Sequence, residues 1–366
     1  MRNHRIALFG SFLSLLVASA ILAASPPNIS GVTISPPFFN PTAGQSVTIA
    51  FNAGVRGKAI VTILDRDRFP IRTLPPLEVS PGLATIEWDG RDDKSGIVPD
   101  EAWNVRIALE NEVYDPSLDF VPRIEDPQPR TYSPVDGILS FRLLHPSRVH
   151  IEAGQATWNA KTGRAEGPIL KTIVNREPRV AGAVVERWNG FDESGTIRVA
   201  SLPNFVVSVL ATSLPDASII TRGNRREAFL DYARRKRPAS ALVARKRAVP
   251  THHHTGLDAF EDRSPVLRVK RSLTAAGALR MEVRVEGPSA AHFLQQPGTM
   301  SVYVDEKRVA TQPSPANPLV LTIPAERLAS GERRIAVNWG SDYGPAATTS
   351  FLLDVQGSRS SLAARR

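Results

Sequence analysis

Alternation of apolar and polar residues is the dominant pattern of this chain. It runs through residues 46–51, 104–109 and 279–285, and residues 59–64 form a β-branched apolar run. A period of two places successive side chains on opposite faces of a strand. Prolines recur too often for long helices, since an interior proline costs about 3 kcal/mol in a helix. The pattern predicts short strands separated by turns, which is typical of β-sandwich domains.

A tryptophan-centred segment occurs twice. The sequence WDGRDDKSG at 88–96 recurs as WNGFDESG at 188–195, one hundred residues later, and the flanking strand signals recur with it. A fixed repeat indicates repeated structural units. We therefore predict two sandwich domains of about 100 residues, at 29–115 and 130–214. Further strand signals predict a third sandwich at 264–357.

Each copy of the repeat has the residues of a buried strand end and a tight turn. A tryptophan fills the sandwich interior, and Asp-Gly or Asn-Gly after it tolerates positive φ. Asp92 and Asp192 are expected to accept hydrogen bonds from amides of the following loop. The repeat positions assigned this structural role are Trp88, Asp89, Gly90, Asp92, Gly96, Trp188, Asn189, Gly190, Asp192 and Gly195.

The first copy carries a more specific resemblance. With ISPPFFNP at 34–41, Arg72-Thr-Leu74 and the tryptophan segment, it resembles the Ig-like domain of flagellar hook-capping proteins, a module found in many exported bacterial proteins. The second copy lacks the Asn-Pro opening, has Asn189 in place of aspartate, and carries an insertion around 158–167. The third unit is similar to generic bacterial Ig-like repeats. The predicted fold is all-β, with three tandem Ig-like or fibronectin-like sandwiches.

The first 24 residues have the parts of a secretory signal peptide. Arg2 and Arg5 precede an apolar run that ends in small residues at Ala23 and Ala24. The alternative is a signal anchor, because the run approaches the length of a bilayer span. We expect cleavage and an exported protein, either periplasmic or on the cell surface.

The net charge of +9 is concentrated outside the predicted domains. Between Arg222 and Arg247, ten Lys and Arg residues face only two acids, and the tail at 358–366 is also basic. The simplest interpretation of 221–261 is a flexible, self-repelling linker, and export disfavours nucleic acid as a partner. The alternative is a contact with an anionic envelope polymer, made by Arg225, Arg226, Arg234, Arg235, Lys236, Arg237, Arg245, Lys246 and Arg247.

Motifs of catalysis and metal binding are absent from the sequence. There is no cysteine, no P-loop, no H-E-x-x-H and no G-x-S-x-G. The acids at 65, 67, 89, 92 and 93 do not have the spacing of a calcium loop, and His252–His254 is interpreted as a solvated tract. We therefore predict no catalytic residues, no cofactor and no metal.

These observations favour an exported, non-catalytic structural or adaptor protein of a bacterial envelope or surface. Its partners would be proteins or polysaccharides that bind to sheet edges and end loops. Two alternatives stay open. One is a glycan-acting enzyme or its accessory domain, with Asp92 or Asp192 beside a second acid. The other is an appendage or flagellar-type assembly scaffold, against which the signal-like N-terminus argues.

Overall fold

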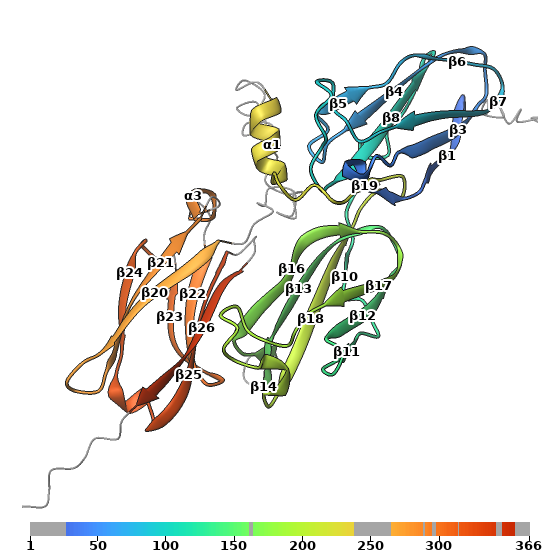
Figure 1. Ribbon diagram of the computed structural model, residues 1–366. Coiled ribbons are helices and arrows are strands. Elements are labelled where there is room, and N and C mark those ends of the chain that lie inside the picture. The colour runs from blue at the N-terminus through green and yellow to red at the C-terminus, as the bar shows by residue number, and fades with distance from the viewer. Residues whose placement is uncertain are drawn as a thin grey trace, which may run out of the picture.

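Three sandwiches follow one another along the chain (Figure 1). The structure, a computed structural model, describes residues 27–160, 164–237, 265–287, 290–294, 298–313, 315–341 and 346–355. The prediction of an all-β fold made of tandem Ig-like or fibronectin-like sandwiches is confirmed. The expected signal peptide at 1–24, the basic residues 245–247, the histidines 252–254 and the tail at 358–366 lie outside the described residues.

The first domain packs a three-stranded sheet on a larger one. The smaller sheet has the order β1 (Ile29–Ser35), β3 (Val47–Ala53), β7 (Gly82–Trp88). The larger has the order β2 (Phe38–Phe39), β19 (Ile219–Thr221), β8 (Ala102–Leu109), β4 (Gly57–Leu64), β5 (Pro70–Thr73), with β6 (Leu77–Val79) on β4 and β9 (Glu112–Tyr114) on β8. The 3-10 turn η1 (Pro41–Ala43) follows β2. In β3 the residues at 47, 49, 51 and 53 are buried, as the period of two predicts.

Two elements of the first domain come from the chain that follows the second domain. These are β19 and the helix α1 (Phe229–Lys236), which lies against the first domain (Figure 1). Phe229, Tyr232 and Ala233 are buried in the core of that domain, at the i, i+3 and i+4 spacing of one helix face. The structure therefore differs from the expected flexible linker over residues 221–237. The difference arises because three apolar side chains among the basic ones give this segment a face to bury.

The second domain has two sheets and a projecting hairpin. One sheet has the order β10 (Ile124–Glu125), β18 (Phe205–Ser213), β13 (Ser147–Gln155), β16 (Ile169–Arg179). The other has the order β11 (Thr131–Ser133), β12 (Ile138–Leu143), β17 (Gly182–Arg187). The hairpin, β14 (Thr157–Asn159) with β15 (Arg164–Glu166), lies in the insertion noted in the second repeat, and η2 (Val199–Ser201) follows the tryptophan loop.

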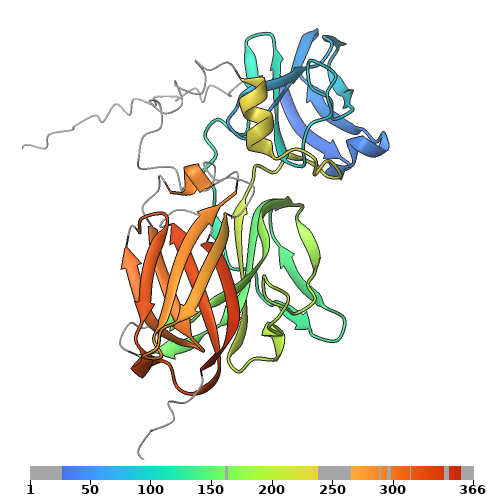
Figure 2. The ribbon, with the colours of Figure 1, turned by 60° about the vertical axis from the view of Figure 1, so that its left-hand side comes forward.

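The third domain is a sandwich of three and four strands. The orders are β20 (Val266–Leu273), β21 (Leu279–Glu286), β24 (Leu319–Ile323), and β23 (Lys307–Pro313), β22 (Gly298–Val304), β25 (Gly331–Ser341), β26 (Ala346–Val355). Short turns of helix, α3 (Ala290–Phe293) and η3 (Ala325–Arg327), connect strands. This domain lies alongside the second domain, with β26 next to β16 (Figure 2). Among the described residues, no helix combines the length and the apolar character of a membrane span.

Candidate functional site

The two tryptophan loops have the same internal geometry. Trp88 is 1% exposed and Trp188 is 5% exposed. The indole N–H of Trp88 donates to the Arg91 carbonyl oxygen at 2.9 Å, and that of Trp188 donates to the Phe191 carbonyl oxygen at 2.8 Å. A buried indole thus keeps its one donor satisfied while its ring fills the core.

The Asx-Gly step that follows each tryptophan forms the tight turn. The Oδ1 atoms of Asp89 and Asn189 each accept the N–H two residues later at 3.1 Å, so the Asp-to-Asn difference keeps this hydrogen bond. Gly90 and Gly190 have φ of 72° and 82°, in the region that favours glycine. A Cβ at Gly90 would also lie 2.5 Å from the Cβ of Pro41. Both the backbone conformation and this close contact therefore exclude a larger residue at position 90.

The carboxylate of each loop aspartate binds its own loop through one oxygen and a neighbouring element through the other. Oδ1 of Asp92 accepts the N–H groups of Lys94 and Gly96 at 2.9 and 3.0 Å. Oδ1 of Asp192 accepts those of Thr196 and Ile197 at 2.8 and 2.9 Å. The second oxygen, Oδ2, is thereby left for a partner outside the loop. Gly195, with φ 73°, donates its N–H to the Asp192 carbonyl oxygen and closes the second loop.

In the first domain, the partner of this second oxygen is α1. Tyr232 donates its hydroxyl to Oδ2 of Asp92 at 3.2 Å, and the Lys236 ammonium forms an ion pair with the same oxygen. Burial alone would raise the pKa of Asp92, but Lys236 and the loop amides hold it below its usual value. Burial and the Asp92 carboxylate raise the pKa of Tyr232, so its hydroxyl stays a donor.

In the second domain, the partner is the third domain. Ser350 of β26 donates its hydroxyl to Oδ2 of Asp192 at 2.6 Å, and Ser194 of the loop donates to it at 2.8 Å. Trp188 lies in an apolar cluster together with Tyr303 and Ala336 of the third domain. The two aspartates therefore anchor equivalent loops to two unrelated neighbours, a helix and a sheet.

The basic residues of 225–237 divide into exposed and buried groups. Arg225, Arg226, Arg234 and Arg235 are exposed. Lys236 and Arg237 face the first domain, where Arg237 forms ion pairs with Asp65 and Asp67. Those two cations, which the alternative interpretation of the sequence offered to an anionic polymer, are thus engaged inside the chain. The acids at 65 and 67, considered as metal ligands, face an arginine instead.

A buried ion triad that the sequence analysis missed joins the first domain to the second. Glu101 contacts Arg66 of its own domain at 3.3 Å and Arg148 of β13 in the second domain. All three side chains are nearly inaccessible to solvent. The guanidinium of Arg66 also lies 4.0 Å from the ring centroid of Phe229, which links α1 to the triad. The sequence held one signal for this triad. Arg148 is a charged residue next to the apolar residues of β13, and a charge at such a position needs a partner.

Side-chain hydrogen bonds replace strand pairing between the second and third domains. The amide side chain of Asn338 accepts the Ile169 N–H at 2.9 Å and donates to the Ile169 carbonyl oxygen at 2.6 Å. Thr348 donates to the same oxygen at 2.6 Å. Ile169 lies on β16, an edge strand, so these contacts satisfy backbone groups that would otherwise be open.

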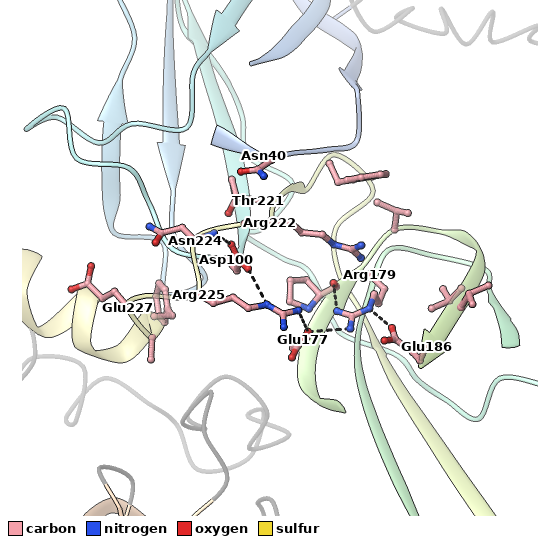
Figure 3. Close-up of a pocket in the computed structure, with 18 of the residues that line it drawn as sticks. Asn40, Asp100, Glu177, Arg179, Glu186, Thr221, Arg222, Asn224, Arg225 and Glu227 are labelled. Carbon is pink, nitrogen blue, oxygen red and sulfur yellow. Dashed lines mark hydrogen bonds and ion pairs between the residues drawn. The ribbon is translucent and has the colours of Figure 1, made fainter. Parts of the chain in front are cut away.

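A cleft of about 710 Å³ lies between the first and second domains (Figure 3). Residues 221–225 and Phe38 line one side, and the end of β16 with β17 lines the other. Arg179 forms ion pairs with Glu177 and Glu186, and Arg225 reaches Asp100 and Glu177 at 3.8 and 4.0 Å. Among the residues described, no group of three or more metal-ligating side chains gathers here or elsewhere.

The sequence matches no family model and no curated protein. Among solved structures, the chain is similar to a tetra-tandem repeat in the extending region of a large adhesion protein, at 12% identity and TM-score 0.19, covering 89% of this chain and 73% of that one. It is also similar to fibronectin(III)-like modules of CbhA from Clostridium thermocellum, at 9% identity and TM-score 0.22, covering 92% and 100%. A third is a 1.5-MDa bacterial ice-binding adhesin, at 11% identity and TM-score 0.20, covering 89% and 96%. The resemblance to hook-capping proteins stays a prediction.

Proposed function

We propose that this chain is an exported, non-catalytic structural adaptor of a bacterial cell envelope or surface. Its tandem domains would present sheet edges and end loops to protein or polysaccharide partners. The observation that carries the proposal is the way both domain junctions are built. The Glu101 triad crosses the first junction, and Asn338, Ser350 and the Trp188 cluster cross the second.

Such junctions suit a protein that sets the spacing of its partners. Domains joined by free linkers move independently, whereas paired backbone groups and a shared apolar cluster hold them in register. The chemistry of the two loop aspartates supports the same role, because each carboxylate is engaged by loop amides and a neighbouring element.

Cross-linking in intact cells, followed by identification of the linked species, tests the adaptor role. The expected result is a reproducible set of envelope proteins or cell-wall polymers linked to exposed positions of the domains. Recovery of the chain without envelope partners, together with monomeric behaviour in solution, would contradict the proposal. Turnover of a glycan substrate that is abolished by Asp92→Asn would instead favour the enzymatic alternative.

Asn338→Ala is expected to loosen the contact between the second and third domains. The substitution leaves the Ile169 N–H without its acceptor, whereas the Ile169 carbonyl oxygen keeps Thr348 as a donor. A buried group without its hydrogen-bond partner typically costs about 1–3 kcal/mol. Because the chain has no cysteine, spin labels at Arg142→Cys and Ser272→Cys can report the distance between the two domains. The distance distribution should be narrow in the parent and broad in the Asn338→Ala variant.

Asn317→Ala is a matched control for that measurement. Asn317 makes the same two hydrogen bonds to the backbone of Val285, but entirely inside the third domain. It should lower the stability of that domain and leave the distance distribution unchanged. An equally narrow distribution in parent and Asn338→Ala would show that this side chain does not hold the junction.

A further inference from the structure

The strand β17 has an open edge that lines the interdomain cleft. It pairs with β12 on one side and is the last strand of its sheet. The Trp188 N–H donates to the Gly137 carbonyl oxygen at 2.8 Å, which fixes the alternation of bonded and non-bonded pairs along this ladder. By that alternation, Ala183 and Val185 direct their N–H and C=O groups toward the open edge. Both residues line the cleft.

Apolar surface accompanies this edge. Val185 is 58% exposed and Phe38, across the cleft, is 44% exposed. The volume of the cleft is within the range of ordinary ligand pockets. An open strand edge bordered by exposed apolar side chains is the arrangement that β-strand addition uses, with main-chain hydrogen bonds for affinity and side-chain contacts for selectivity.

Ion pairs engage the carboxylates of the cleft and two of the three arginines that line it. The carboxylates of Glu177, Glu186 and Asp100 face Arg179 or Arg225, and Glu227 pairs with Arg235. Arg222 has no ion-pair partner among the described residues, and its guanidinium lies 5.2 Å from the ring centroid of Phe38. Burial and the neighbouring Arg179 cation lower the pKa of Arg222, while three carboxylates of the cleft oppose that shift.

We propose that this cleft binds an extended peptide segment of a partner protein, which adds as a strand to the open edge of β17 and places an acidic side chain at Arg222. The proposal rests on the adaptor function and names the chemistry of one partner. The free backbone groups of β17 favour a peptide over a polysaccharide, since they repeat at the spacing of a strand. The guanidinium of Arg222, which forms no ion pair among the described residues, favours a carboxylate, with which arginine forms bidentate, charge-assisted hydrogen bonds.

Selection from a library of acetylated and amidated hexapeptides on the purified chain tests this proposal. We expect enrichment of peptides with one Asp or Glu among β-branched residues. Arg222→Gln should weaken the binding of a selected peptide by about tenfold or more, because a charge-assisted hydrogen bond is lost. Arg280→Gln, an exposed arginine on β21 in the third domain, is the matched control and should leave binding unchanged.

Backbone methylation of the peptide tests strand addition without altering the protein. N-methyl groups at alternate residues remove the donors that would pair with β17, so one of the two methylation registers should abolish binding. Absence of acidic enrichment, indifference to Arg222→Gln, or indifference to both methylation registers would overturn the proposal. Arg222-dependent binding of polygalacturonate in place of peptides would assign the cleft to an acidic polysaccharide and also overturn it.

Failure of this proposal and failure of the adaptor function can be told apart. If the cleft binds no peptide, the cross-linking experiment on the full chain should still recover envelope partners at other surfaces. If the adaptor function itself is wrong, those partners are absent whatever the cleft binds. Arg222→Gln should leave the distance between the second and third domains unchanged, because Arg222 lies in the cleft between the first and second domains.

Discussion

Trp88→Ala is expected to destabilise the first domain by about 3–5 kcal/mol, the cost typical of truncating a large buried aromatic residue. The indole is enclosed by Phe39 at 5.8 Å and Trp103 at 6.1 Å between ring centroids, both in edge-to-face geometry. Trp103 in turn contacts Phe229 and Tyr232 of α1. Removal of Trp88 therefore opens a cavity at the centre of an aromatic cluster that also holds the helix.

Hydrogen exchange followed by mass spectrometry measures this effect domain by domain. Amides of β3, β4 and β8 should exchange about a hundredfold faster or more in Trp88→Ala, whereas those of β22 and β25 should keep their parent rates. Leu83→Ala, on the same strand but 73% exposed, is the control and should change exchange little. Parent-like protection of β8 in Trp88→Ala would show that the ring does not support this core.

The tryptophan loop of each sandwich could be predicted from the sequence because its contacts are local. Trp88, the Asx-Gly turn and Asp92 lie within five residues of each other, and their hydrogen bonds join neighbours in the chain. Alternation along β3 likewise identified its buried face from residues two apart. Local signals of this kind depend on backbone geometry, which the residue types themselves restrict.

Contacts between distant segments could not be derived in the same way. Tyr232 and Asp92 are 140 positions apart, and no pattern in either segment predicts the contact between them. The basic residues around α1 suggested a solvated linker, although Phe229, Tyr232 and Ala233 form an apolar helix face. The density of basic residues outweighed this apolar face in the prediction of a linker. Only the structure shows that two of its cations meet buried carboxylates.

The pairing of Arg237 with Asp65 and Asp67 closes the C-terminal end of α1 onto the first domain. Asp65 is fully buried and its Oδ1 accepts the N–H groups of Asp67 and Phe69 at 2.8 and 2.9 Å, while Oδ2 faces Arg237. Burial, opposed by the charge of Arg237, raises the pKa of Asp65 to about 6. Arg237 is thus the cation that keeps this carboxyl ionised at neutral pH.

Arg237→Met is expected to cost about 3–5 kcal/mol at pH 8, because it leaves a buried carboxylate without its cation. The cost should shrink toward pH 5. The pKa of Asp65 is higher in the folded parent than in the unfolded chain. At pH values between these two pKa values, the folded state binds more protons than the unfolded state. The contribution of Asp65 to the free energy of unfolding therefore increases as the pH falls. Without Arg237 the pKa of Asp65 in the folded state rises further. Protonation of Asp65 therefore removes the cost of its buried charge at a higher pH in the variant than in the parent.

Denaturant unfolding monitored at pH 5, 6, 7 and 8 measures that convergence. The double variant Asp65→Asn/Arg237→Met should recover part of the lost stability and reduce its pH dependence. The reason is that the Asp65 carboxyl is gone, whereas Asp67, the second partner of Arg237, keeps its charge. Arg235→Met is the matched control on the same helix: its partner Glu227 lies on an exposed surface, so the loss should stay below about 1 kcal/mol. A penalty for Arg237→Met that is equal at pH 5 and pH 8 would mean that the arginine acts through packing on Phe69 and Phe229 rather than through the charge of Asp65.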